Sequence, residues 1–369
     1  MIVGLTDDTE LVSAAAAALV APRTERNSFT LHAPLELLAR AELLPMVDLP
    51  ARDRARRRIA TLAQGFRSSG DELPPAPPLT AQTPADALDA LGRAVDLADP
   101  DLADSAASWL AEHLSAPEIA GLLAGPLVRE MGAAAHAPIL FASWLRMPRA
   151  DPRPFRGVAR RLAEYPDIRV EPEWLDPGRS DGSVDELESA LLAVPKDEEP
   201  GWGIFMLVAA AHRAKVMVDV PRVGDADTAE AFRVLFRVAA RSMIEDDPSH
   251  APYGWSHALT IPLGICQTLH LHDRRREALD VATILAAGFR HAHRLDVLPS
   301  TTDPPAAAPT IRESATRAAV EHDAHLVKYV VACRHAARFD PDHELLYRAA
   351  AARLCDWWDA NPSADDPLA

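Results

Sequence analysis

Cysteine is scarce in this chain. The 369 residues include three, Cys266, Cys333 and Cys355, which lie far apart and form no CxxC pair. This scarcity excludes a disulfide framework and a thiolate zinc site, and it is typical of proteins from a reducing compartment such as the cytoplasm. We expect the three thiols to act as small buried hydrophobic groups.

Long hydrophobic runs are also missing. The longest apolar stretches, at 13–21 and 204–211, are too short to span a bilayer. The first ten residues, MIVGLTDDTE, hold three acidic residues and no basic one, whereas an export signal needs a basic start and an apolar run. We therefore predict a cytoplasmic protein without a membrane segment.

Basic residues are outnumbered, with 38 Lys and Arg against 54 Asp and Glu, so the formal net charge is -16. An acidic surface repels phosphate backbones and anionic lipids, which excludes nucleic acid as a partner. Hydrophobic residues make up 48% of the chain, enough for a packed core. We predict one globular domain over residues 1–369.

Strand signals are few. Only KVMVDV at 215–220 has a β-like pattern, and helical patterns recur along the rest of the chain. No repeat of fixed period appears, and no heptad or self-complementary stripe decides the oligomeric state. We predict an all-α, multi-helix protein. Its helices are interrupted by a proline-rich loop at about 71–84, an irregular segment at about 165–183 and a proline-rich loop at about 298–310.

One helix is predicted over 311–338, and it holds the most unusual side chain of the sequence. Thr310 and Glu313 form a capping box at its start. At about 100° per residue, Asp323 and Arg334 fall on one narrow strip. We expect this strip to face solvent.

Lys328 falls away from that strip, on a face that it shares with His322, His325 and Tyr329. A helical lysine is ordinarily solvated or snorkels to the surface, whereas a buried lysine has a partner or a lowered pKa. A neutral lysine is nucleophilic, and it can take up carbon dioxide and become a carbamate that binds metal through oxygen. His325 and Lys328 are three residues apart, so both can reach a common ion.

Three further histidines lie in apolar helical sequence. His136 lies in GAAAHAPILFASWL, His257 in YGWSHALTIPLG, and His32 in NSFTLHAPLELLARAELL. Each one alone is typical of a hydrogen-bonded core histidine. Together with His325 they could form a cage of neutral imidazoles, a ligand set that suits iron, copper or zinc.

Four stretches resemble, in the same order, segments of the questin oxidase-like family of helical oxygenases, which act on aromatic polyketides such as anthraquinones. DAHLVKYVVAC at 323–333 resembles the family's Asp-x-His-x-x-Lys segment. The segments around His136, His257 and His32 resemble its other histidine segments. The resemblance implies a mononuclear non-heme Fe(II) held by histidines and a carbamylated lysine. The matching ligands are His32, His136, His257, His325 and Lys328, with His322 as the alternative to His325.

The resemblance also implies the substrates, a fused-ring aromatic molecule and dioxygen, and a reaction that inserts oxygen or cleaves a ring. Five protein ligands would leave one coordination position for dioxygen or a substrate oxygen. Tyr253 and Tyr329 are the candidate catalytic residues beside the metal. A planar substrate needs an apolar slot. The candidate walls of this slot are Trp144, Trp202, Trp255 and Phe205.

The sequence leaves the reductant and two other functions open. No GxGxxG motif follows a strand, so a nicotinamide reductant such as NADPH would bind without a Rossmann fold. A non-catalytic helical scaffold or ligand-binding protein is the second reading, and it predicts no stoichiometric metal. A histidine-bound zinc hydrolase is the third, and the absence of an HExxH motif counts against it.

Overall fold

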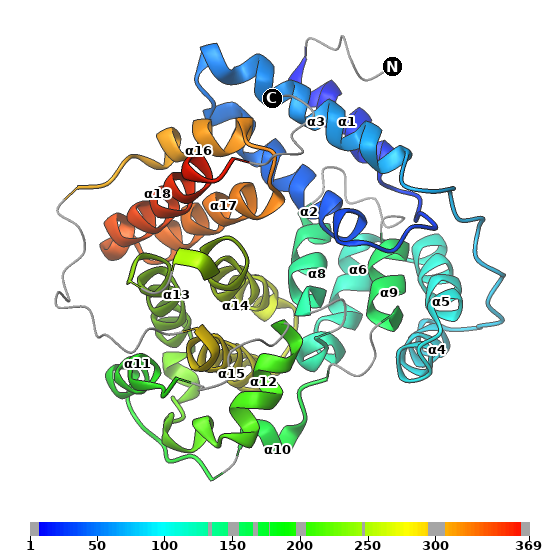
Figure 1. Ribbon diagram of the computed structural model, residues 1–369. Coiled ribbons are helices and arrows are strands. Elements are labelled where there is room, and N and C mark those ends of the chain that lie inside the picture. The colour runs from blue at the N-terminus through cyan, green and yellow to red at the C-terminus, as the bar shows by residue number, and fades with distance from the viewer. Residues whose placement is uncertain are drawn as a thin grey trace.

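A computed structural model describes residues 7–131, 135–146, 155–164, 169–176, 178–196, 204–245, 248–293 and 307–362. These residues form helices and isolated β-bridges but no strand, so the predicted all-α class is confirmed (Figure 1). The helices up to residue 200 are α1 (Asp8–Ala18), α2 (Ser28–Leu43), α3 (Leu49–Arg67), α4 (Pro84–Asp96), α5 (Pro100–His113), α6 (Ala116–Leu123), α8 (Ala137–Leu145), α9 (Phe155–Glu164), α10 (Pro172–Leu175) and α11 (Val184–Ala193). The later helices are α12 (Ile204–Arg213), α13 (Thr228–Glu245), α14 (Ser256–Thr268), α15 (Arg275–His293), α16 (Ile311–Val320), α17 (Ala324–Phe339) and α18 (Glu344–Ala360).

Helix α2 lies between two hydrophobic clusters. The larger cluster is built around α13, α14, α15, α17 and α18, and it includes Leu35 and Leu43 of α2. The smaller cluster joins α1 and α3, which cover the top of the molecule in Figure 1, to Leu37 and Leu44. Because apolar residues are buried on two sides of α2, this helix has a fixed orientation relative to both clusters.

A glycine lets α8 and α14 approach closely. A Cβ atom added at Gly264 would lie 3.1 Å from the carbonyl oxygen of Pro138 and 3.3 Å from the Cα atom of Ile139. His136 lies at the start of α8, and His257 lies about two turns before Gly264 on α14. The close approach therefore brings the two histidine-bearing elements together.

The single helix predicted over 311–338 is wrong, because the chain forms two helices that separate at Glu321 to Asp323. Glu321 and Asp323 have extended backbones, with ψ angles of 155° and 134°. The Oδ1 atom of Asp323 accepts hydrogen bonds from the N–H groups of His325 (2.6 Å) and Leu326 (3.2 Å) and so caps α17. The Asp323 side chain is 17% exposed and does not lie on a solvent-facing strip.

Two arginines of the neighbouring helices hold this break. Arg40 is 2% exposed, and its guanidinium donates to the carbonyl oxygens of Ala319 (2.9 Å) and Glu321 (2.8 Å). Arg58 of α3 donates to the carbonyl oxygen of Val320 (2.8 Å). The last carbonyls of a helix have no partner within it, so these arginines stabilise the end of α16. They also place the start of α17 beside α2.

The remaining sequence predictions have mixed outcomes. No helix covers 71–83, and the described parts of 165–183 and 298–310 hold only the short α10. The KVMVDV segment is no strand, because Val216–Asp219 form a 3₁₀ helix. Arg334 does not lie on an open strip, since it pairs with Glu42 at 2.5 Å. Within the described residues, no helix is both long and apolar enough to cross a membrane.

We predict opposite effects for two glycine substitutions. Gly264→Ala should lower the free energy of unfolding by about 1–2 kcal/mol, because the added methyl group meets backbone atoms that cannot rotate away. Gly92→Ala in α4 meets no heavy atom within 4 Å and should raise it by about 0.5–1 kcal/mol. Urea unfolding of both variants measures the difference, and a stabilising Gly264→Ala would refute the close approach.

Candidate metal centre

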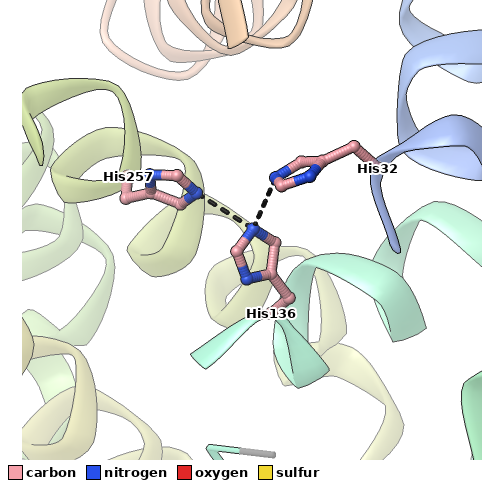
Figure 2. A group of neighbouring side chains, drawn as sticks. All are labelled: His32, His136 and His257. Carbon is pink, nitrogen blue, oxygen red and sulfur yellow. Dashed lines mark hydrogen bonds between the residues drawn. The ribbon is translucent and has the colours of Figure 1, made fainter. Parts of the chain in front are cut away.

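Three histidine nitrogens meet in the interior between α2, α8 and α14. His136 Nε2 lies 3.0 Å from His32 Nε2 and 3.0 Å from His257 Nε2 (Figure 2). All three side chains are buried, and one ligand atom from each lies within 4.8 Å of the other two. In the described part of the chain, no other three His, Cys, Asp or Glu residues form such a group.

Backbone carbonyl groups fix the tautomer of two of these rings. His32 Nδ1 lies 2.7 Å from the carbonyl oxygen of Ser28, and His257 Nδ1 is hydrogen-bonded to the carbonyl oxygen of Tyr253. A carbonyl oxygen only accepts, so each Nδ1 carries the hydrogen and donates it. The Nε2 atom of each neutral ring then carries a lone pair and no hydrogen, and both lone pairs point towards His136.

His136 cannot satisfy both neighbours. Its Nε2 carries at most one hydrogen, so at most one of the two 3.0 Å contacts is a hydrogen bond. The other contact brings two lone pairs together in a buried site, where an unmade hydrogen bond is expensive. A cation between the three nitrogens removes this conflict, because every lone pair can then point at the ion. The donor set therefore fits a metal that prefers neutral imidazole, such as iron, copper or zinc.

Unusual backbone conformations precede two of the three histidines. Ala135, directly before His136, is fully buried and has a φ angle of 66°, which costs about 1–2 kcal/mol for a residue with a Cβ atom. Ala251–Trp255 form one π-helical turn directly before α14, and this turn supplies the carbonyl group that binds His257. Such departures from regular structure are concentrated at functional sites.

A fourth histidine ring joins the group from α17. The His325 ring centroid lies 4.6 Å from that of His32 and 5.1 Å from that of His257. Its Nδ1 lies 3.4 Å from Asp323 Oδ1, so a carboxylate faces the ring nitrogen. This contact does not form a hydrogen bond, and Asp323 Oδ1 accepts instead from the backbone N–H groups of His325 and Leu326. The structure thus brings all four predicted histidines together, and it places the alternative, His322, on the wall of a neighbouring cavity.

Lys328 is buried one turn after His325, and within the described residues its Nζ atom has no hydrogen-bond partner. Burial lowers the pKa of Lys328 to about 7, although the negative charges of Asp323 and Glu36 act in the opposite direction. A substantial fraction of this amine is therefore neutral near pH 7. The sequence prediction of an inward-facing lysine is met by this geometry.

Burial also lowers the pKa of the histidines. It is the largest cause for His32, His257 and His325, and the nearby charge of Lys328 lowers all three further. These imidazoles are consequently neutral at physiological pH. Neutral imidazole is the form that binds metal, so the folded protein presents its ligands already deprotonated.

A cavity of about 600 Å³ opens beside His32 and His325. Most of the residues on its wall have polar side chains, and we call it the polar cavity; these residues include Glu25, Asn27, Glu36, Arg58, Thr61 and His322. One aromatic side chain of the wall, Phe29, is 37% exposed. The volume is in the range of pockets that bind drug-sized ligands, so it is large enough for a molecule of several rings.

The two tyrosines predicted for the site lie in different places. Tyr253 is 53% exposed, and its ring meets the His325 ring edge-on at a centroid distance of 4.9 Å. Tyr329 is fully buried in the interface of α17 with α18. Its pKa is raised by burial and by the neighbouring Cys333 and Tyr347. Tyr329 does not lie on the wall of the polar cavity, and its role beside the metal stays a prediction.

The aromatic residues predicted as walls do not line the polar cavity where they are described. Trp255 is 1% exposed, with its ring 5.9 Å from that of His293. Trp144 lines a separate apolar pocket. Trp202 and the side chain of Phe205 lie outside the described residues. The substrate slot formed by these four aromatic residues stays a prediction.

Sequence reasoning missed several residues of the site. Asp323 was assigned to a solvent strip because the helix break before it was not foreseen. Glu36 follows His32 by one helical turn and Phe29 precedes it by three residues, so both spacings place them on the side of α2 that carries His32. The positions three residues before and four residues after His32 are therefore the sequence signal that identifies Phe29 and Glu36.

We predict a pH dependence of stability that comes from the buried histidines. In the folded, metal-free protein the pKa of His257 is well below 6.5, whereas in the unfolded chain it is about 6.5. As the pH falls below about 6.5, the unfolded chain therefore binds more protons than the folded protein, and the free energy of unfolding falls. Replacing one such residue, in His257→Gln, should reduce this slope by about 1.4 kcal/mol per pH unit. Denaturant titrations between pH 5 and 8 with a chelator present measure it. Equal slopes in the variant and the natural protein would contradict the prediction.

Comparisons with protein-family models and with curated proteins find no match to this chain. The resemblance to the questin oxidase-like family therefore stays a prediction.

Proposed function

We propose that this protein is a non-heme iron-dependent oxygenase that acts on a fused-ring aromatic substrate. One observation carries the proposal. Three Nε2 atoms converge, and at most one of them, that of His136, carries a hydrogen. His32, His136 and His257 hold the metal, and His325 and Lys328 complete its surroundings. Iron is chosen among the imidazole-binding metals on the resemblance of the four histidine segments. Bound Fe(II) supplies the electrons that activate dioxygen.

Lys328 acts as a carbamate in this proposal. The neutral amine adds carbon dioxide, an N–C bond forms, and one proton leaves to water. The product is an anion, which offsets the charge of the cation where four neutral imidazoles cannot. It also provides acceptor oxygens at a position where the unmodified Nζ atom has no partner among the described residues.

The polar cavity binds the organic substrate. A planar ring system packs against Phe29 on the wall of the cavity and reaches Tyr253, whose ring lies 4.9 Å from that of His325. Burial and the nearby charge of Asp323 raise the pKa of Tyr253, so its hydroxyl group keeps its proton and donates a hydrogen bond to a substrate oxygen. The carboxylates and amide on the wall accept hydrogen bonds from phenolic hydroxyl groups.

Loading with iron tests the metal centre. Protein titrated with Fe(II) without air should bind a single iron per chain, and His136→Ala should lose this iron, because the central nitrogen of the group is removed. His113→Ala is the matched control, since His113 is exposed and stacks on Trp109 away from the site. Elemental analysis after gel filtration gives the answer. Full iron in His136→Ala would refute the site.

Replacing Lys328 tests the carbamate. Lys328→Met keeps the length and the helix propensity of the side chain and should retain the fold. It should weaken iron binding by at least about tenfold and abolish oxygen uptake with an anthraquinone substrate. Oxygen electrode traces with and without NADPH also show whether a reductant takes part. Full iron and full turnover in this variant would exclude a role for the lysine.

The same assays separate the two alternatives. A zinc hydrolase would also use three histidines and one open position, and it would prefer zinc and consume no oxygen. A scaffold would bind no stoichiometric metal, and it would tolerate His136→Ala with no loss beyond packing.

A further inference from the structure

A small pocket lies one helical turn beyond the histidine cluster. Its wall contains the residue three positions after each histidine: Leu35 after His32, Ile139 after His136, Thr260 after His257, and Lys328 after His325. Residues three apart lie on one face of a helix. The four helices that carry the histidines therefore also enclose this small pocket, whose volume is about 40 Å³.

A second pocket lies next to the small one. It has a volume of about 70 Å³ and lies between α2, α8 and α9. Leu35 and Ser143 line both pockets, so these two side chains lie at the junction between them. We call it the apolar pocket because most residues on its wall are hydrophobic; they include Leu38, Phe66, Leu140, Trp144 and Val158.

The outer end of the apolar pocket approaches the surface. Val20, Pro22 and Leu31 on its wall are only half-buried. Two of the charged groups on its wall pair with each other, because Arg161 lies 2.6 Å from Glu164. Most of the other residues on the wall have apolar side chains.

Size separates these pockets from the polar cavity. The polar cavity is about 600 Å³ and opens on His32 and His325, whereas the apolar pocket and the small pocket are about 70 and 40 Å³. Lys328 lies on the wall of the small pocket. Pockets of that size exclude a fused-ring molecule but admit a diatomic gas. An apolar cavity stays dry and favours uncharged, apolar guests such as xenon.

We propose that the apolar pocket and the small pocket form a path by which dioxygen reaches the histidine cluster, separate from the entry of the organic substrate. The inference rests on the proposed oxygenase function and adds a route for its gaseous substrate. Dioxygen enters beside α9, passes Leu35 and Ser143, and arrives at the Lys328 side of the cluster. The organic substrate occupies the opposite, polar side, so the two substrates do not compete for one entrance.

Xenon tests the path without any need for turnover. Crystals of the protein pressurised with xenon should show the gas in the apolar pocket and beside Lys328. Ser143→Leu fills the junction and should remove the inner xenon. Leu35→Ala widens the junction and should raise the inner occupancy. Xenon absent from both pockets of the natural protein, or inner xenon unchanged in Ser143→Leu, would overturn the path.

The dependence of turnover on dioxygen is the second readout. Ser143→Leu should raise the KM for dioxygen severalfold and leave kcat at saturating oxygen and the KM for the organic substrate unchanged. Ser105→Leu is the matched control, because Ser105 is also buried but lies in α5 and lines none of the three pockets. It should leave the KM for dioxygen unchanged.

These outcomes distinguish the path from the proposed function. Turnover with an unchanged KM for dioxygen in Ser143→Leu would overturn the path and leave the oxygenase standing. Xenon that binds as expected in a protein that never consumes oxygen would refute the oxygenase, and with it the assignment of dioxygen to the path. If Ser143→Leu does not fold, the smaller Ser143→Val and the opposite change Leu35→Ala carry the same comparison.

Discussion

The candidate metal centre depends on one arrangement, in which the Nε2 atoms of three buried, neutral histidines lie next to one another. His32 and His257 donate their Nδ1 hydrogens to backbone carbonyl groups, so both turn lone pairs towards His136. A buried group of this kind is unfavourable unless a cation joins it. The surrounding fold holds it in place, through the close approach at Gly264, the π-helical turn before His257 and the strained backbone at Ala135.

The fourth histidine and the lysine depend on a different constraint. Arg40 and Arg58 bind the carbonyl groups at the end of α16, and Asp323 then caps α17 beside α2. This arrangement buries Lys328 next to the histidines and leaves its amine with a lowered pKa. The polar cavity adjoins His32 and His325, and the small pocket adjoins Lys328, so the cluster has two separate spaces of different size beside it.

Local patterns were enough to predict the helical class and to select His32, His136, His257, His325 and Lys328. Helical periodicity and an apolar setting identify side chains that point inward. The break before α17 could not be predicted, because the Thr310 capping box and the continuous helical pattern favour one helix, and the arginines that stop it come from distant sequence. A related reason explains why Trp144 and Trp255 do not line the polar cavity. A tryptophan in apolar sequence is expected to be buried, but only tertiary packing decides which cavity it reaches.

X-ray absorption at the iron K edge of protein loaded with Fe(II) without air tests the central claim most directly. The account predicts a first shell of nitrogen and oxygen atoms only, together with the outer-shell scattering of several imidazole rings. A shell of oxygen ligands without imidazole scattering would contradict it, because the histidine cluster would then not be where the iron binds.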